Sequence, residues 1–158
     1  MALTRINNQA LTNVTSAGLP SGSVIQVKHA TTSSGSANAV TVSSGYWSDI
    51  VTLTITPKSS TSIIIVHCIG GVESLSGASN KGSRLRLLKG STNVTEQAYN
   101  NYLDNTNQQN IHTAGLQYVD DHNTTSAITY KLQVGAYNSN ARGNRYADSV
   151  IIAYEVAQ

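Results

Sequence analysis

Two patterns of hydrophobic positions stand out between residues 62 and 91. From Ile63 to Ile69 the chain is almost continuously apolar and rich in β-branched residues, which fit a pleated strand better than a helix. Such a run predicts a strand that is buried on both faces or lies at the centre of a sandwich. From Arg84 to Leu87 charged and apolar residues alternate, which predicts a strand with one wet and one dry face. We expect these two segments to be neighbouring core strands around which the others pack.

Further strands follow at fairly even spacing, separated by polar loops. Pro57 cannot donate to a ladder and ends the segment 46–56, and the short polar turn after it favours antiparallel pairing with the next strand. The first and last strands both look apolar, so they should lie close together in one sheet. The pattern predicts an all-β fold, an antiparallel jelly-roll-like β-sandwich of about eight strands with a short N-terminal arm. The remaining predicted strands cover 24–30, 40–42, 93–99, 111–119, 127–134 and 150–156.

The arm is the segment before the first strand. Apolar residues recur there three or four positions apart, a spacing that allows a short amphipathic helical turn. The segment is too polar to form a core alone, and Gly18-Leu19-Pro20 separates it from the sandwich. It is either a frayed terminus or an adhesive arm that orders against a partner. We therefore divide the chain into an attachment arm, residues 1–20, and a jelly-roll knob, residues 21–158; the expected contact residues of the arm are Leu3, Ile6, Leu11 and Val14.

The composition narrows the functional classes. The 158 residues fit one domain, and only 11% are charged, so Ser, Thr, Asn, Gln and Gly must form the surface, as is typical of extracellular or virion β-proteins. The net charge is +2 and the basic residues are dispersed, which argues against nucleic-acid binding. No apolar stretch reaches the ~18 residues of a membrane span, and no signal peptide is evident. The single cysteine, Cys68, lies in the most apolar run and is expected to pack in the core.

Residues with the potential for chemistry are present but not arranged in a known motif. The cluster from Asp120 to Asn123 could hold a hard cation, but it lacks the spacing of a calcium loop, and a plain turn is the favoured interpretation. The four histidines are scattered, and His67 is expected to be a hydrogen-bonded core residue. There is no nucleophile elbow, phosphate loop or carboxylate pair. We therefore expect no catalytic residues, no metal site and no cofactor.

Aromatic and arginine side chains are the better candidates for recognition. Trp47 and Tyr102 combine an apolar ring with a polar tip, which suits stacking on a glycan, although core or interface packing is the commoner role of such residues. Arg84 and Arg86 project from the wet face of their strand, where they could contact another subunit.

Several segments after Pro20 resemble small β-rich structural proteins of tailed bacteriophages, particularly marine and cyanobacterial ones. They are strand-and-turn patterns without a chemical signature: Ser21–Val27, Leu53–Ser60, Arg84–Ser91, Asn123–Gln133 and Ile151–Gln158. The resemblance implies a jelly-roll-like knob, often trimeric, that is carried on the virion as a head fibre, capsid decoration or tail fibre. It implies no catalytic residues, and it makes the N-terminal arm the attachment segment.

These observations lead to one main hypothesis and two alternatives. The main hypothesis is a non-enzymatic bacteriophage surface protein, a homotrimer whose arm docks on the major capsid protein or a tail protein and whose knob faces outward. The first alternative is a tail-fibre receptor-binding or carbohydrate-binding module that holds host surface glycans through Trp47 or Tyr102. The second, a small hydrolase, has no motif in its favour.

Overall fold

The computed structural model describes residues 19–75, 81–100 and 109–158, with the backbone alone for 98–100. Five predicted site residues lie outside the described ranges: the arm residues Leu3, Ile6, Leu11 and Val14, and the candidate glycan contact Tyr102. Within the described part, no helix is long and apolar enough to cross a membrane. All strand pairs are antiparallel, and they form two sheets that pack face to face.

Sheet A contains four long strands in the order β1 (Val24–Thr32), β10 (Ser149–Val156), β4 (Ile63–Ser74) and β7 (Asn110–Asp120). Beyond the end of β10, β4 also pairs with the short β9 (Ala141–Gly143), which in turn pairs with β2 (Val40–Val42). Sheet B has the order β3 (Trp47–Ile55), β8 (Ile128–Tyr137), β5 (Gly82–Lys89) and β6 (Thr92–Asn100). The first and last strands, β1 and β10, are neighbours, as predicted.

The connections follow the double Greek key of a jelly roll. Counted along the chain, the eight long strands alternate between the sheets, so that the first, eighth, third and sixth form sheet A and the second, seventh, fourth and fifth form sheet B. Among the strands that the structure describes, only β5 and β6 form a hairpin within one sheet, through a turn at Gly90 with φ of 60°. The predicted antiparallel jelly-roll sandwich is therefore confirmed; the short β2 coincides with the predicted strand 40–42, whereas β9 lies in a segment that was expected to be a loop.

Two predicted pairings are wrong. The apolar run forms β4 in sheet A, whereas the alternating Arg-Leu segment forms β5 in sheet B, so the two strands face each other across the core. In the same way, the short turn after Pro57 carries the chain from β3 in sheet B to β4 in sheet A. A tight connection between sheets has the same sequence signature as a hairpin, because both need only a few polar residues.

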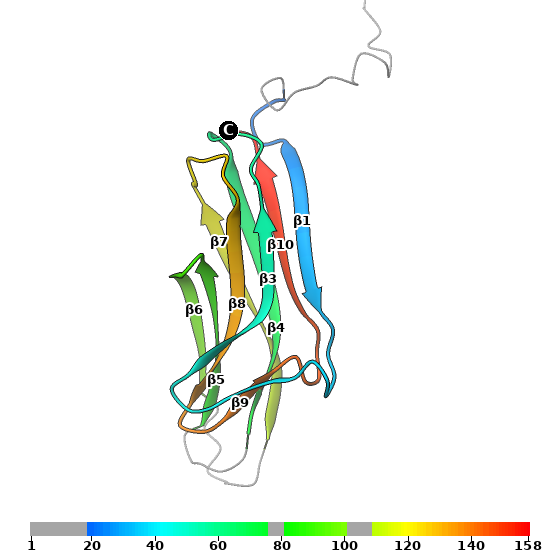
Figure 1. Ribbon diagram of the computed structural model, residues 1–158, viewed down its shortest axis with the longest axis vertical. Coiled ribbons are helices and arrows are strands. Elements are labelled where there is room, and N and C mark those ends of the chain that lie inside the picture. Colours follow the sequence, from blue (N-terminus) through cyan, green and yellow to red (C-terminus); the bar gives the residue numbers. More distant parts are fainter. Residues whose placement is uncertain (1–18, 76–80, 101–108) are drawn as a thin grey trace, which may run out of the picture.

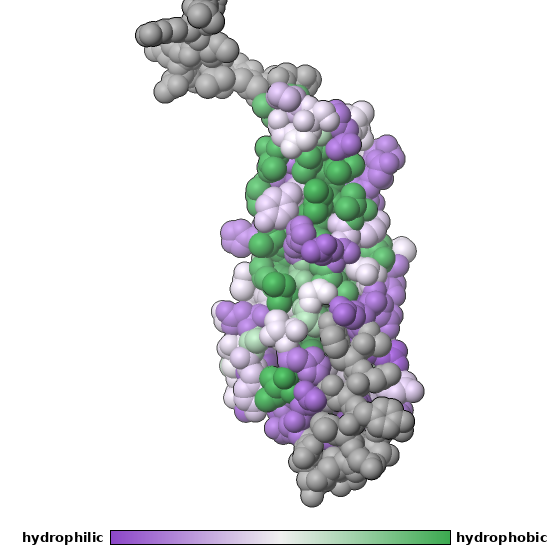
Figure 2. Space-filling model, turned by 180° about the vertical axis from the view of Figure 1, so that it is seen from behind, coloured by the Kyte–Doolittle hydropathy of each residue, from purple (hydrophilic) through white to green (hydrophobic). Residues whose placement is uncertain are grey.

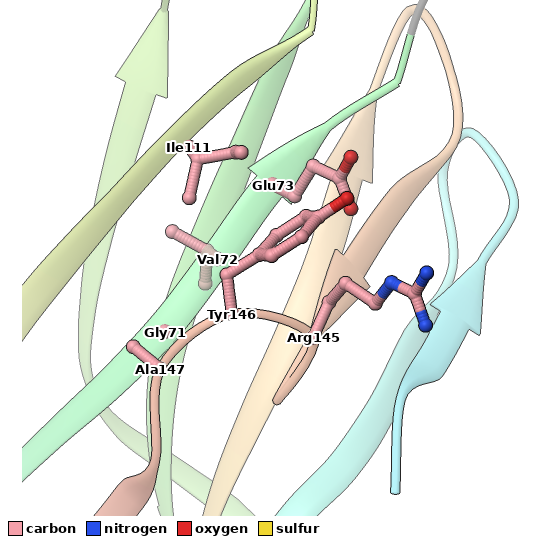
Figure 3. A pocket seen from close by; sticks show the side chains of 7 residues that line it. All are labelled: Gly71, Val72, Glu73, Ile111, Arg145, Tyr146 and Ala147. Atoms are coloured by element: carbon pink, nitrogen blue, oxygen red, sulfur yellow. The ribbon is translucent and has the colours of Figure 1, made fainter. Parts of the chain in front are cut away.

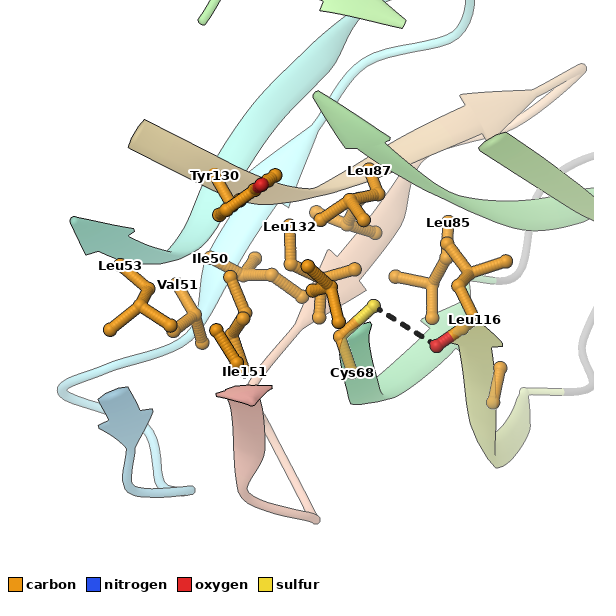
Figure 4. Packing of buried hydrophobic residues seen from close by; sticks show 14 of the residues in the cluster. Ile50, Val51, Leu53, Cys68, Leu85, Leu87, Leu116, Tyr130, Leu132 and Ile151 are labelled. Atoms are coloured by element: carbon orange, nitrogen blue, oxygen red, sulfur yellow. Dashed lines mark hydrogen bonds between the residues drawn. The ribbon is translucent and has the colours of Figure 1, made fainter. Parts of the chain in front are cut away.

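The core fills the space between the sheets (Figure 4). It is formed by the inward-facing residues of each strand, among them Ile64, Val66, Cys68, Leu85, Leu87, Tyr130, Leu132 and Ile151. Cys68 is buried as predicted, and its thiol donates to the Leu116 carbonyl oxygen at 3.5 Å. Burial raises the pKa of this thiol to about 12, so Cys68 acts as a small apolar residue.

The molecule is long and narrow (Figure 1). The C-terminus and the beginning of β1 lie at one end, where the Gly22 amide donates to the Ala157 carbonyl oxygen at 2.8 Å. The short β9 lies toward the opposite end. A segment that precedes β1 therefore leaves the sandwich at a defined end.

Candidate interaction surfaces

The outer face of sheet A is unusually apolar. Strand register places its outward side chains in rows across the sheet, one residue from each strand. In the order β1, β10, β4, β7, the first row contains Val27, Tyr154, Ile65 and Val119. The second row contains His29, Ile152, His67 and Gln117, and the third contains Thr31, Val150, Ile69 and Gly115. The face extends beyond the first row through Val24, Val156 and Ile63.

Large hydrophobic side chains are exposed on this face. Val24 is 54% exposed, Val27 50%, Ile69 46% and Val119 59%. Figure 2, which views the molecule from behind, shows hydrophobic residues gathered over its upper and middle part, with a group of hydrophilic ones among them. We call the rows above and their extension the apolar face. Exposed patches of this kind mark sites of protein or membrane contact.

None of the residues of the apolar face is Asp, Glu, Lys or Arg. His29, His67 and Gln117 form a polar row beside Ile152, and the hydroxyl-bearing Thr31 lies in the next row. The His67 ring meets the Tyr154 ring edge to face, with centroids 5.9 Å apart. His67 is half-buried and points outward, so its expected place in the core is wrong.

A hollow of about 310 Å³ lies on this face beside Gly115. It is lined by His67, Cys68, Ile69, Gly115, Leu116 and Gln117. Because Gly115 has no side chain, the space beside Ile69 and Gln117 stays open.

The other end of sheet A is covered by the chain itself. The segment 144–148 crosses β4 so closely that a Cβ on Gly71 would lie 2.5 Å from the Ala147 carbonyl oxygen. Tyr146 and Arg145 flank a shallow depression beside Glu73 (Figure 3). Glu73 is only 1% exposed, and the Arg142 guanidinium lies 3.5 Å from its carboxylate. This cover gives the apolar face a definite lower border.

The outer face of sheet B is polar by comparison. Arg86 donates to Gln133 at 2.7 Å, Gln133 donates to Asp49, and the Lys131 ammonium lies 3.0 Å from the Asp49 carboxylate. Burial alone would raise the pKa of Asp49, but Gln133 and Lys131 lower it on balance. These charges compensate one another within the chain.

The predicted recognition residues Trp47, Arg84 and Arg86 meet on sheet B. The Arg86 guanidinium lies 4.3 Å from the Trp47 ring centroid, and a Cβ on Gly135 would lie 2.5 Å from the same ring. The Arg84 guanidinium lies 4.7 Å from the Tyr137 ring and 3.6 Å from Glu96. The Trp47 ring thus already has contacts within the chain, which weakens its case as a platform for a sugar ring.

The polar cluster from Asp120 to Asn123 has partners within the chain. Asp120 is 2% exposed and accepts from Lys89 at 2.7 Å and from Tyr130 at 2.5 Å. His122 lies 3.3 Å from the Ser62 hydroxyl, and Asn123 has a positive φ of 50°, as befits a turn. In the part of the chain that the structure describes, no group of three or more His, Cys, Asp or Glu side chains is arranged to hold a metal ion.

One arrangement that resembles a catalytic relay is brought together by the fold and was not predicted. The Ser83 hydroxyl lies 3.4 Å from His112 Nε2, and His112 Nδ1 lies 3.1 Å from the Asn110 side-chain oxygen. Burial lowers the pKa of His112. Ser83, however, is fully buried and lies inside β5 rather than on an exposed turn, so a substrate has no access to its hydroxyl.

Comparisons with known proteins assign no function. No family model matches the chain, and no curated protein is similar to it in sequence. Among solved structures it is similar to the VP2 protein of infectious bursal disease virus in T=1 particles, with 17% identity over 84% of this chain and a TM-score of 0.39. It is also similar to a structure of the Gt strain of that virus, with 14% identity over 86% of this chain and a TM-score of 0.43. A third similar structure is dimeric latent PorU from Porphyromonas gingivalis, with 9% identity over 88% of this chain and a TM-score of 0.45.

The chain spans only part of each of these proteins, namely 36% and 39% of the two viral chains and 14% of PorU. With identities of 17% or less and TM-scores below 0.5, none of them indicates what this chain does. The function must therefore be inferred from the surfaces of the molecule itself.

Proposed function

We propose that this chain is a non-enzymatic structural protein of a bacteriophage virion, a capsid decoration or head-fibre protein on the virion surface. The observation that carries the proposal is the contrast between the two outer faces of the sandwich. Sheet A presents an uncharged apolar face, and sheet B presents a network of internally paired charges. One face is suited to protein contact and the other to water.

The fold and the sequence support this proposal together. Jelly rolls serve as viral capsid domains, but also as lectins and cupins, so the fold alone does not select among these functions. The sequence segments that resemble phage structural proteins favour the viral option. The arrangement of Ser83, His112 and Asn110 resembles a catalytic relay, but the Ser83 hydroxyl is buried. This burial favours a protein without enzymatic activity.

The proposal includes a homotrimer that is mounted through residues 1–20 on the major capsid protein or on a tail protein. The beginning of β1 lies at one end of the long axis, so an arm there would hold the knob upright with its other end outward. The apolar arm residues Leu3, Ile6, Leu11 and Val14 would contact the mounting protein. The trimer would cover apolar surface that a lone knob leaves exposed.

Quantitative mass spectrometry of purified virions, from the phage whose genome encodes the chain, tests this function. The intact chain should be present in many copies, and immunogold labelling should place it on the particle surface. A variant with serine at Leu3, Ile6, Leu11 and Val14 should fold normally and be lost from the particle. Absence of the intact chain from virions contradicts the proposal, and retention of the serine variant contradicts the attachment role of the arm.

A further inference from the structure

We propose that further copies of this chain cover the apolar face of sheet A, in a trimer whose three apolar faces surround an axis parallel to the strands. The threefold symmetry rests on the proposed function, whereas the choice of surface rests on the structure.

The sequence of β4 and its burial do not match. Its continuous apolar run is typical of a strand that is buried on both faces. In the single chain, however, only Ile64, Val66 and Cys68 are buried, whereas Ile63 and Ile65 remain half-exposed and Ile69 is 46% exposed. The sequence of β4 is that of a central strand, and covering the apolar face would make it one.

The absence of charge on the apolar face is compatible with a second copy as its occupant. Charge complementarity gives specificity for a partner of another kind, and like charges would repel a second copy. The apolar face has no charged residue, so it neither requires an oppositely charged partner nor repels its own copy. The charges that flank it, such as Lys28 on β1, lie outside the rows.

The polar row limits how copies can meet. His29, His67 and Gln117 need hydrogen-bonding partners when they are covered, because buried polar groups without partners are costly. Around an axis parallel to the strands, each row of one copy lies at the same height as the identical row of its neighbours. The polar row then meets the polar row, and the Val-Tyr-Ile-Val row meets its own equivalent.

The width of sheet A is compatible with a threefold arrangement. Four strands about 4.8 Å apart give a sheet roughly 19 Å wide, and three such sheets arranged as a triangular prism each lie about 5.5 Å from the axis. That distance is close to half of the ~10 Å at which sheets normally pack, so side chains fill the centre. Over the eight residues of β10, each face covers about 500 Å² in projection. Each copy shares this face between its two neighbours, so each pairwise contact takes about half of it, below the ~800 Å² per partner of a standard two-chain interface, and three such contacts hold the trimer together.

The same axis keeps the mounting ends together. Rotation about an axis parallel to the strands leaves the beginning of β1 of every copy at the same end of the trimer. All three arms then point toward one mounting surface. An axis perpendicular to the strands would place copies head to tail and separate the arms.

Sedimentation equilibrium of the purified full chain tests the inference. The wild type should be a trimer. Val119→Asp and Ile69→Asp place a charge on the apolar face at positions that are 59% and 46% exposed, so each chain should keep its fold and become a monomer. Thr52→Asp, on the exposed outer side of β3, is the matched control and should remain a trimer. Should an aspartate variant fail to fold, the near-isosteric Val119→Thr should still raise the trimer dissociation constant at least several-fold.

A wild type that is monomeric or dimeric overturns the threefold arrangement. A trimer that withstands every substitution on the apolar face overturns the choice of surface. These results are independent of virion incorporation. A trimer that depends on Val119 but is absent from virions contradicts the proposed function alone, whereas a monomer that is found in virions contradicts this inference and the homotrimer of the proposed function but leaves the virion role standing.

Discussion

Asp120 joins the two sheets at the residue level. Its buried carboxylate on β7 accepts from Lys89 on β5 and from Tyr130 on β8. Burial and the contact with Asp120 raise the pKa of Tyr130, so its hydroxyl stays protonated and donates. We predict that Lys89→Met lowers the free energy of unfolding by about 2 kcal/mol, less than the ~3–5 kcal/mol of a fully buried pair, because Lys89 is 32% exposed. Urea denaturation measures this loss.

Two variants calibrate that result. Tyr130→Phe removes one donor while Lys89 remains, and should cost about 1–2 kcal/mol. Lys131→Met breaks the ion pair between Lys131, whose side chain is 36% exposed, and Asp49, whose side chain is 39% exposed. This variant should lower the free energy of unfolding by less than about 1 kcal/mol. If Lys131→Met proves as costly as Lys89→Met, the burial of Asp120 is not the cause.

Gly135 is the residue that lets Trp47 lie against sheet B. An added Cβ would stand 2.5 Å from the ring, so Gly135→Ala should displace Trp47 from Arg86 and lower stability by about 1–3 kcal/mol. Because Trp47 is the single tryptophan, its fluorescence reports the displacement directly as a shift of the emission maximum. Gly115→Ala is the matched control, since its nearest neighbour lies at an ordinary 3.5 Å. Unchanged emission from Gly135→Ala would contradict the close packing.

His67 shows what sequence periodicity settles at the residue scale and what it leaves open. Alternation along β4 requires His67 to share a face with Ile63 and Ile65, opposite Val66 and Cys68. The pattern could not tell which face is the core, because both are apolar. This ambiguity led to the wrong prediction for His67. A trimer that covers the outer face of β4 would explain why both of its faces are apolar.

Glu155 acts at the scale of elements, because it ties the end of β10 to the connection between β3 and β4. Its carboxylate accepts from the Ser62 hydroxyl at 2.6 Å, from the amides of Lys58 and Ser59, and from the Gln26 side chain. Burial alone would raise the pKa of Glu155, but these donors lower it on balance. The carboxylate therefore stabilises the folded chain only while it is ionised.

The sign of the pH effect follows from that direction. A carboxyl whose pKa is lowered by folding contributes its full stability above the pKa of the unfolded chain, about 4.3, and loses it as the pH falls through the folded value. We predict that the free energy of unfolding of the wild type falls more steeply below pH 5 than that of Glu155→Gln. Urea denaturation across this pH range measures both slopes. Equal slopes would show that Glu155 contributes nothing to acid sensitivity.

Strand positions were predictable from sequence, but strand partners were only partly so. The segments of β4, β5, β8 and β10 all have period-two or continuously apolar patterns, and each was found close to its predicted position. Which sheet a strand joins depends on contacts between residues far apart in the chain, which local periodicity does not encode. The apolar face was missed for a related reason, since it is assembled from β1, β10, β4 and β7, whose outward residues meet only after folding.

Association should govern the stability of the whole molecule. If copies cover one another's apolar faces, unfolding and dissociation are linked, and the melting temperature rises with protein concentration. We predict this rise for the wild type and for Thr52→Asp, and a concentration-independent melting temperature for Val119→Asp, since a monomer has no dissociation step. Differential scanning calorimetry over a hundredfold range of concentration measures it. A wild-type melting temperature that stays constant over that range would mean that a single chain is stable with its apolar face open to water.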